Sequence, residues 1–298
     1  MSLADSRTLQ GLQRSRLRPA ARSQSIGPHA LFRAADQCLG GAPQRPQTLG
    51  TTQALMEQLR DFSDDRLVLG CIFCGGQDET REHVPSRAFL DVPYPENLPV
   101  VGACRQCNGG FASDEEYLAC LIEVVVAGST DPQAMRRPKI ARTLAHADAL
   151  RTRLEAARET SEAGTLFHPE VERVQRVLTK LAAGHAAYEL ARSHLDSPIR
   201  VWWRPIDLLE PADRDAFEAP DVTPLYGEVG TRGMHRMMVL QFSLMSDSGE
   251  RLEEQVLVSD WVEVQPGRYR YHASDDGESV SVRMVIGDYL AVEVEWES

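Results

Sequence analysis

The sequence predicts an α+β fold, and three observations carry that prediction. Between residues 131 and 215 the apolar residues recur at intervals of three and four, which is typical of amphipathic helices. From about residue 237 onward the interval changes to two, with Gly or Asp between the segments, which is typical of antiparallel strands. Between residues 65 and 127, two Cys-x-x-Cys motifs bracket short apolar segments, and a helical pattern follows them. The chain therefore divides into a cysteine-bracketed, a helical and a sheet-forming region.

The composition is that of an ordinary globular protein with an acidic total charge. Of 298 residues, 42% are hydrophobic and 26% are charged, and the formal net charge is -12. No stretch approaches the roughly 18 uninterrupted apolar residues of a membrane-spanning helix, so we expect no membrane role. Any nucleic-acid-binding face has to be local, because such faces are basic.

The basic residues are almost all arginine, with Lys139 and Lys180 as the two lysines. Arginine suits phosphate recognition, and a compositional bias of the source genome explains the excess equally well.

The cysteines indicate a reducing compartment. Residues 1–30 lack the continuous apolar segment of a signal peptide. We therefore expect a cytoplasmic protein in which paired Cys-x-x-Cys motifs bind metal rather than form disulfides. We interpret Cys38 as an incidental thiol and Cys120, in an apolar helical pattern, as a small buried hydrophobic residue.

Residues 1–50 predict a disordered basic leader. They contain seven Arg, two Asp and many Ser, Gln, Pro and Gly, with no sustained apolar period. An organelle transit peptide, a nonspecific nucleic-acid-binding tail and an over-extended start site are alternatives for this segment. Residues 51–62 follow with apolar side chains at helical spacing and predict a short helix.

The cysteine-bracketed region, residues 51–130, predicts two short strands and a helix. Residues 67–70 form a short strand or turn before the first motif, and residues 97–101 form a strand before the second. Asn108, Gly109 and Gly110 predict a turn. Ser113 and Glu116 have the spacing of a capping box, so we expect a buried helix that begins at Ser113 and stops near residue 128.

The two cysteine motifs have the spacing of a structural zinc site on Cys71, Cys74, Cys104 and Cys107. Two thiolates three positions apart bind one metal in a tight knuckle, and four close a tetrahedral site that contributes directly to folding. We expect the glycine pairs at 75–76 and 109–110 to supply positive φ angles there. Four reduced core cysteines are the alternative. A closed four-cysteine site has no open coordination position, so any catalysis has to come from residues that the zinc positions.

The remainder divides into a mainly helical region, 131–215, and a β-rich region, 216–298. Helices are predicted at residues 140–160 and 171–195, and a strand is predicted at 199–203. Five further strands are predicted at residues 239–244, 255–264, 268–272, 279–285 and 289–296. We interpret His185, on an apolar helical stripe, as a core residue rather than a ligand. The β-rich region is expected to form an antiparallel sheet, which offers a surface for a protein partner or a homodimer.

Two further segments complete a known pattern: Glu82-His83-Val84-Pro85 between the cysteine motifs, and Asn108 directly after the second. With the four cysteines and the following helix, they resemble the HNH endonuclease superfamily, in the branch whose two Cys-x-x-Cys motifs bracket the catalytic loop. The resemblance covers residues 65–127 and implies a zinc-stabilised ββα-metal (HNH-like) module. It does not extend to the other two thirds of the chain.

The resemblance implies hydrolysis of DNA phosphodiester bonds, with 5′-phosphate and 3′-hydroxyl products. It implies that His83 is the general base on water, that Glu82 ligates a divalent cation, and that Asn108 ligates the cation or orients the histidine. One hard cation can stabilise the phosphorane charge while a neutral imidazole removes the proton from water. Oxygen ligands suit Mg²⁺ or Mn²⁺ rather than a second zinc. On an extended strand, Glu82 and His83 point to opposite faces unless the backbone turns.

The sequence departs from the family pattern at one position. The family's helix histidine, about nine positions after the asparagine, is missing, and Glu116 occupies that region. Glu116 is a candidate replacement ligand, which would give an all-oxygen site of Glu82, Asn108 and Glu116. The alternative for Glu116 is the capping-box role.

Three arginines near the motif, Arg81, Arg87 and Arg105, are candidate phosphate contacts, and ordinary surface charge is the alternative for each. The second functional hypothesis is a zinc-stabilised binding or interaction module whose nuclease site has decayed. The acidic net charge and the missing helix histidine favour it.

Overall fold

The computed structural model describes residues 32–33, 70–162, 164–223, 231–245 and 251–297. The leader expected at 1–50, apart from Phe32 and Arg33, lies outside the described residues, as do Cys38, the helix expected at 51–62 and residues 67–69 of the first expected strand. The described chain is mixed α+β with a C-terminal antiparallel sheet, as the sequence predicts.

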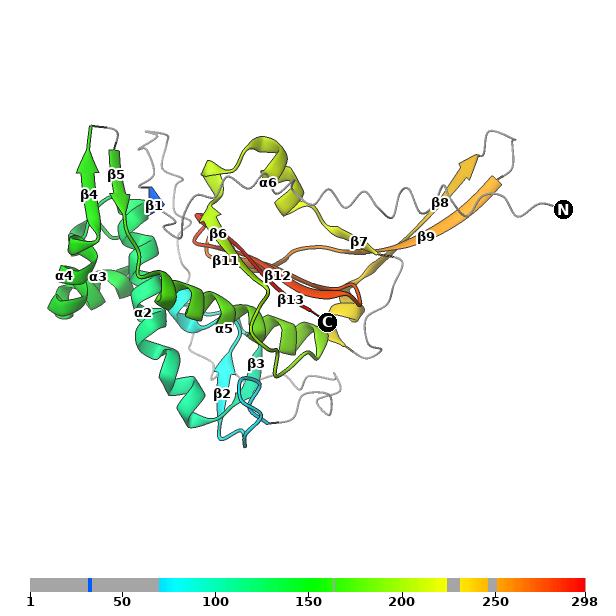
Figure 1. The fold of residues 1–298 in the computed structure, drawn as a ribbon, viewed down its shortest axis with the longest axis horizontal. Helices are drawn as coiled ribbons and strands as arrows, with labels where there is room; N and C mark the ends of the chain where they lie inside the picture. Colours follow the sequence, from blue (N-terminus) through cyan, green and yellow to red (C-terminus); the bar gives the residue numbers. More distant parts are fainter. Residues whose placement is uncertain (1–31, 34–69, 163, 224–230, 246–250, 298) are drawn as a thin grey trace, which may run out of the picture.

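Helix α5 (Val171–Leu190) lies at the centre of the molecule. One side of it packs on a five-stranded sheet, and the other side contacts helix α2 (Arg105–Ala127) and the paired strands β2 (Thr80–His83) and β3 (Val100–Ala103) (Figure 1). Its buried positions, such as Val174, Leu178 and Leu181, recur at helical spacing. The helix stops before the expected residue 195, because Ala191 adopts the left-handed conformation (φ 56°). A single hydrophobic core joins α2, α5 and the sheet.

The five-stranded sheet is antiparallel throughout, in the order β10-β11-β12-β13-β6. Its strands are β10 (Val262–Gln265), β11 (Tyr269–Asp275), β12 (Ser279–Ile286), β13 (Leu290–Glu297) and β6 (Arg200–Pro205). Val280, Val282 and Met284 alternate along β12 on the buried face toward the core. Because β6 pairs with β13, this sheet takes one strand from the region expected to be mainly helical.

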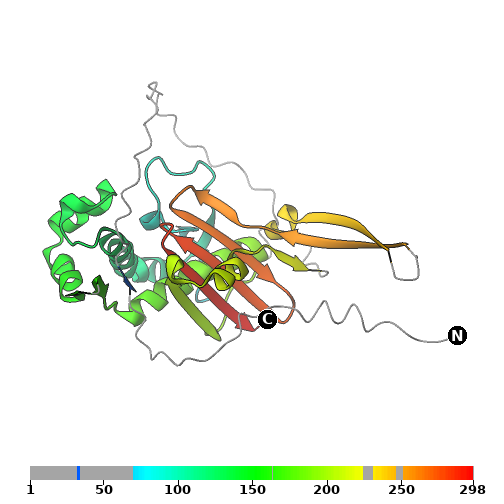
Figure 2. The same ribbon diagram turned by 90° about the horizontal axis from the view of Figure 1, so that it is seen from above.

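A second antiparallel sheet extends away from the body of the molecule (Figure 2). It consists of β7 (Asp221–Thr223), β9 (Arg251–Ser259) and β8 (Met238–Met245) in the order β7-β9-β8. The single strand predicted at 255–264 is therefore two strands in different sheets, since the chain leaves β9 at Ser259 and enters β10 at Val262. Short helices η4 (Ile206–Leu208) and α6 (Pro211–Glu218) lie between β6 and β7 and so connect the two sheets, and α7 (Arg232–Arg236) precedes β8.

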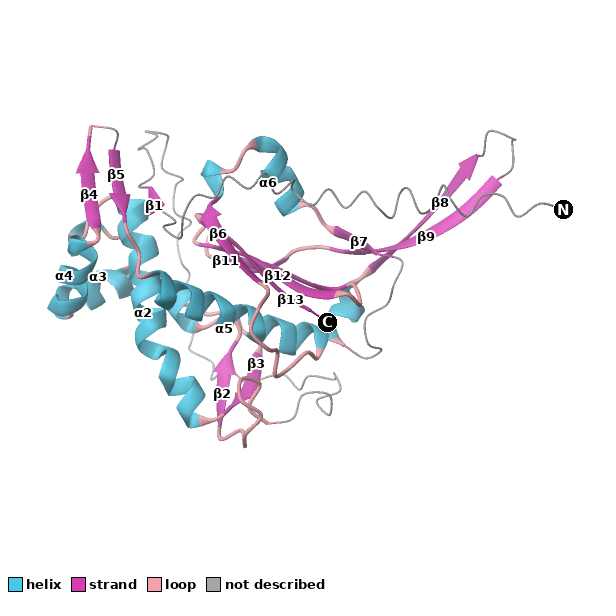
Figure 3. Cartoon of the chain, viewed as in Figure 1, coloured by secondary structure: helices cyan, strands magenta, loops and turns pink. Residues whose placement is uncertain are grey.

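The helical region is more broken than the sequence predicts (Figure 3). After η3 (Pro132–Ala134), the helix expected at 140–160 is divided into α3 (Pro138–His146) and α4 (Asp148–Ala156). The break lies at Ala147, whose backbone is not helical (φ -104°, ψ 71°). Strands β4 (Arg158–Ser161) and β5 (Gly164–Phe167) then form a hairpin that β1 (Phe32–Arg33) extends. The prediction of a helix at 140–160 is therefore correct for most of the segment and wrong at its C-terminal end, where β4 begins.

Helix α2 begins eight residues earlier than the capping-box signal predicts. Its N-cap is Cys104, whose sulfur accepts a hydrogen bond from the backbone N–H of Cys107 at 3.3 Å. The turn expected at Gly109 and Gly110 is therefore helical, and neither glycine has a positive φ, whereas Gly75 does (φ 73°). A helix glycine costs about 1 kcal/mol relative to Ala. The buried C-terminal half of α2 offsets that cost through packing.

Helix η2 (Arg87–Phe89) lies between β2 and β3.

Within the described residues, none of the helices combines the length and the apolar character needed to cross a membrane.

Candidate functional site

The four motif cysteines converge at one end of the β2–β3 pair. Cys71 and Cys74 lie in the loop before β2, while Cys104 and Cys107 lie at the start of α2. Their sulfur atoms all lie within 4.8 Å of one another, and the sulfurs of Cys74 and Cys104 are 3.8 Å apart. A zinc–sulfur bond of about 2.3 Å in a tetrahedron places neighbouring sulfurs about 3.8 Å apart. The four cysteines could therefore hold a zinc ion.

The first knuckle is fixed from outside by His194, which the sequence gave no reason to single out. The His194 ring hydrogen-bonds to the carbonyl oxygen of Cys71 at 2.9 Å through Nε2, and the His194 backbone N–H donates to the Ile72 carbonyl at 3.0 Å. His194 itself has a positive φ of 57°. The segment after α5 thus holds the cysteine loop against the rest of the fold, as outer contacts of metal ligands commonly do.

A buried ion cluster joins β2, α2 and α5. Nζ of Lys180 lies 2.5 Å from Oε1 of Glu82 and 2.5 Å from Oε1 of Glu115. The other Glu115 oxygen accepts a hydrogen bond from the Ser86 hydroxyl at 3.1 Å. All four residues are buried, with exposed fractions of 7% for Glu82, 8% for Glu115, 4% for Lys180 and 7% for Ser86. We call Glu82, Glu115 and Lys180 the buried ion cluster.

The approach of α5 to the strands explains why Lys180 can reach this position. One turn further along the helix, Gly184 lies so close to Val84 that an added Cβ would be 3.1 Å from Cγ2 of Val84. Residues four apart share a helix face, so Gly184 brings the backbone close on the side from which Lys180 projects. Burial raises the pKa of Glu82, and the Lys180 ammonium opposes that rise by favouring the carboxylate.

Asn108 lies in the first turns of α2 and faces the same strand. Its Nδ2 donates a hydrogen bond to Oγ1 of Thr80 at 3.0 Å, and the Thr80 hydroxyl in turn donates to the Ala103 carbonyl at 2.8 Å. Thr80 and Glu82 are two positions apart on β2, so their side chains share one face of the strand. Thr80 and Glu82 are therefore on the strand face that Asn108 contacts from α2.

His83 is the last residue of β2 and has a different environment from Glu82. Strand alternation directs the two side chains to opposite faces, and Glu82 is buried whereas His83 is half-buried. Burial, with further contributions from Arg87 and Lys180, lowers the pKa of His83 below its ordinary value. The lowered pKa favours the neutral imidazole. No hydrogen bond joins its ring to any other residue in the described ranges.

The remaining sequence-predicted residues lie on the surface. Arg81, Arg87 and Arg105 are exposed. The Arg87 guanidinium stacks over the Tyr94 ring at 5.1 Å, and the backbone N–H of Arg105 donates to Glu79 at 3.1 Å. Glu116 is exposed on α2, one position from the buried Glu115. The structure thus brings Glu82 next to Glu115 and directs Glu116 to solvent.

Two residues of the buried ion cluster were missed from the sequence, although each left a signal. Glu115 lies three positions before Leu118 and seven before Ile122, so it shares their buried stripe, which Glu116 does not. Lys180 is one of only two lysines and falls within a largely apolar helical segment. A charged residue on a buried stripe needs an ionic partner, but the partners are distant in sequence.

The cysteine cluster is the only group of three or more Cys, His, Asp or Glu side chains in the described part of the chain that is close enough to hold a metal ion. No family model, curated protein or solved structure matches the chain.

Proposed function

We propose that this chain is an HNH-type endonuclease that hydrolyses phosphodiester bonds of DNA, with His83 as the general base. The observation that carries the proposal is the environment of His83: its side chain is half-buried at the end of β2, burial lowers its pKa, and Glu82 and the Asn108–Thr80 contact lie on the opposite face of the same strand. A general base has to be unprotonated and has to reach solvent or substrate. His83 meets both requirements.

The paired strands β2 and β3 and helix α2 support the proposal through their order. The chain enters β2 from one cysteine knuckle and enters α2 through the other, so a metal on the four sulfurs would hold both ends of this unit together. Catalytic side chains on such a rigid frame keep their geometry during reaction. The zinc would contribute folding free energy and no open coordination position.

The proposal includes Mg²⁺ or Mn²⁺, and the predicted ligands do not fit that cation as they lie. The space between the carboxylates of Glu82 and Glu115 has the donors that a hard cation prefers, but the Lys180 ammonium takes it. Glu116 faces solvent. We therefore derive no catalytic step through the cation and assign proton transfer from water to Nδ1 or Nε2 of His83.

Nicking of supercoiled plasmid tests the proposal. We expect the wild-type protein, loaded with zinc and supplied with Mg²⁺ or Mn²⁺, to produce open circles, and we expect His83→Ala to lose this activity by about 10²-fold or more. His146→Ala is the matched control, because His146 is an exposed histidine on α3. Equal nicking by wild type and His83→Ala would contradict the proposal, as would no nicking by the wild type.

The second candidate is a zinc-stabilised binding module that does not cleave. The specific observation in its favour is that Lys180 supplies the positive charge between Glu82 and Glu115. A chain that carries its own cation at this position has no need of a metal there. This candidate predicts no cation-dependent nicking by any variant, including Lys180→Met, while nucleic-acid or protein binding persists in His83→Ala.

A further inference from the structure

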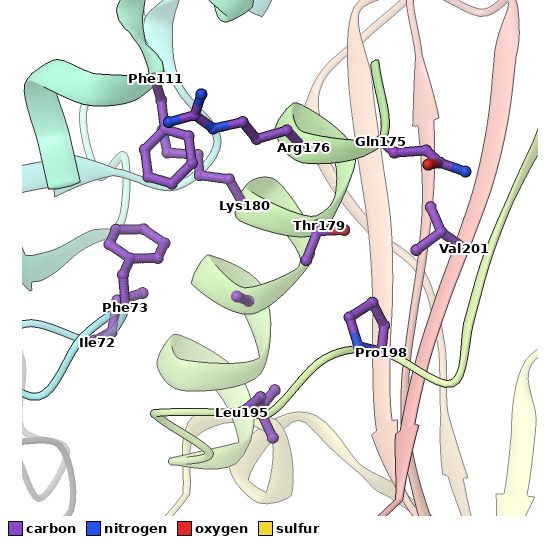
Figure 4. A pocket seen from close by; sticks show the side chains of 11 residues that line it. Ile72, Phe73, Phe111, Gln175, Arg176, Thr179, Lys180, Leu195, Pro198 and Val201 are labelled. Atoms are coloured by element: carbon purple, nitrogen blue, oxygen red, sulfur yellow. The ribbon is translucent and has the colours of Figure 1, made fainter. Parts of the chain in front are cut away.

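A groove lies beside the buried ion cluster, between the first cysteine knuckle and α5. It has a volume of about 580 Å³ and is open to solvent. The first knuckle and the start of α2 form one wall, α5 forms the floor, and the segment that enters β6 forms the opposite wall (Figure 4). This volume falls in the range of about 300–1,000 Å³ that is typical of ligand sites. None of the residues assigned to catalysis above lines it.

One wall of the groove is aromatic. Phe73, from the knuckle, and Phe111, from α2, place their ring centroids 5.3 Å apart with an interplanar angle of 55°. Both side chains are only partly buried and line the groove. Two adjacent, partly exposed phenyl rings offer stacking surface to a flat ligand, because any aromatic base has a π-face that they can contact.

Helix α5 carries a cation next to the aromatic wall that is available to an anion. The Arg176 side chain is 56% exposed, and its guanidinium lies 5.3 Å from the Phe111 ring centroid. Its hydrogen bonds to Asp114 and to the Gly110 carbonyl are both long, at 3.3 Å. Asp114 is held more closely by Arg173, at 2.6 Å. Arg176 can therefore turn its remaining N–H groups toward a ligand without leaving Asp114 unpaired.

The floor supplies polar groups that can recognise the edge of a ring. Gln175 is exposed and Thr179 is half-buried, and both line the groove from α5. Lys180 also lines the groove, but its ammonium is committed to Glu82 and Glu115. The groove therefore combines stacking surface, one accessible positive charge and side-chain amide and hydroxyl groups.

We propose that this groove binds an unpaired nucleotide of a nucleic-acid strand, with its base against Phe73 and Phe111 and its phosphate at Arg176. The proposal rests on the endonuclease function above and adds the structure of the substrate to it. A base that is paired in a duplex has both faces stacked and cannot lie against the phenyl rings. With a formal net charge of -12, the chain needs an attraction besides phosphate charge, and stacking supplies one.

The test is fluorescence anisotropy with a labelled ten-residue oligothymidylate, a duplex of equal length, and thymidine monophosphate as competitor. We would use full-length, zinc-loaded protein with His83→Ala and no divalent cation, so that nothing is cleaved. We expect the oligothymidylate to bind more tightly than the duplex, and the mononucleotide to compete only weakly. Duplex preference, no oligothymidylate binding, or full competition by the mononucleotide would overturn the proposal.

Two variants locate the binding. Phe111→Ala is expected to weaken oligothymidylate binding about tenfold or more, since base–aromatic stacking accounts for about that much per base. Arg176→Gln is expected to weaken it and to reduce the slope of log affinity against log salt by about 0.7, the value for one phosphate. Arg214→Gln, with a 44% exposed arginine on the distant α6, is the matched control and should change neither quantity.

Each variant would first be checked for zinc content and melting temperature, and Phe111→Leu would replace Phe111→Ala if the latter did not fold. Wild-type affinity in either Phe111 variant would overturn the groove proposal. Strand binding without cleavage by the histidine-intact protein would overturn only the endonuclease proposal. Cleavage with unchanged binding in the Phe111 variants would overturn only the groove proposal.

Discussion

The cysteine cluster and the buried ion cluster both lie where β2 and β3 meet α2, but they are built differently. The four cysteines come from two short motifs that flank β2 and β3, so local spacing alone predicts them. The ion cluster joins Glu82 and Glu115 to a lysine far along the chain, on α5. The first is suited to a metal ion, whereas the second contains its own cation. Two neighbouring polar sites can therefore differ greatly in how well the sequence predicts them. A site built from closely spaced motifs is predictable, whereas a site whose partners are far apart in the sequence is not.

The largest effect is expected from Cys104→Ala, which removes one sulfur of the cysteine cluster and also the N-cap of α2. Structural zinc contributes about 10–16 kcal/mol of apparent binding free energy in small zinc domains, so we expect loss of bound metal and a fall of at least about 5 kcal/mol in unfolding free energy. Metal analysis and urea unfolding measure both.

Cys120→Ala is the matched control for that change, because Cys120 is a buried cysteine of the same helix with no part in the cluster. It should keep its metal. A wild type without bound metal, together with unchanged stability in Cys104→Ala, would show that the four cysteines are only reduced core residues.

The next largest effect is expected from Lys180→Met. Removing one partner of a buried ion pair typically costs about 3–5 kcal/mol, because it leaves uncompensated charge in the interior. Here Glu82 and Glu115 would face each other without the ammonium. Urea unfolding at pH 7 should show the loss, and adding Glu82→Gln and Glu115→Gln to Lys180→Met should recover much of it.

A change of less than about 1 kcal/mol for Lys180→Met would mean that the cluster is not a buried ionic contact. The cysteine cluster would then be the one remaining polar site of the two.

Smaller effects should separate Glu115 from Glu116. Glu115→Gln replaces a charged acceptor of Lys180 by a neutral one and should lower the unfolding free energy by about 1–3 kcal/mol. Glu116→Gln alters an exposed side chain and should stay within about 0.5 kcal/mol of the wild type. Equal effects at the two positions, or a larger effect at Glu116, would contradict the burial of Glu115 beside Lys180.

The smallest expected effect is a shift in the pH dependence of nicking. A general base works only when neutral, and burial together with Arg87 and Lys180 lowers the pKa of His83. Activity should therefore persist as the pH falls past the ordinary histidine value of about 6.5 and be lost only as it passes through the lowered pKa. Initial rates from pH 5 to 8 measure this. Arg87→Gln should move the acid limb toward higher pH, and an acid limb above 6.5 in the wild type would contradict the stated environment.

Elements whose pattern lies within one short segment of the sequence could be predicted, whereas features without such a local signal could not. Period-two segments near the C-terminus are strands because apolar side chains recur at every second position on the core face, and the pattern is complete within each segment, although the other face of β12 and β13 is also largely covered. The start of α2 was misplaced because Ser113 and Glu116 imitate a cap, while Cys104 caps the helix with a sulfur, which no standard capping signal includes. The break at Ala147 has no Gly or Pro to announce it.

The predictability of the candidate site follows the same rule. Alternation along a strand already implied that Glu82 and His83 would face apart, and β2 is extended at both residues. The resemblance indicated Glu116 as the ligand on the helix. Helix geometry would have favoured Glu115 as the buried glutamate, because it lies on the same helix face as Leu118. The role of Lys180 depends on how α5 packs against Val84, and the sequence does not encode that contact in any local pattern.

We propose that His83 activates water for hydrolysis of phosphodiester bonds in DNA, and ligation of the nicked product tests this directly. Supercoiled plasmid would be treated with zinc-loaded wild-type protein and Mg²⁺ or Mn²⁺, and the nicked circles would be purified and incubated with DNA ligase. We expect ligase to seal the nicks without prior repair of their ends, because hydrolysis of the bond between phosphorus and the 3′-oxygen leaves 5′-phosphate and 3′-hydroxyl groups. We expect His83→Ala to yield no nicks to seal. Nicks that resist ligation, or sealable nicks at wild-type level from His83→Ala, would contradict it.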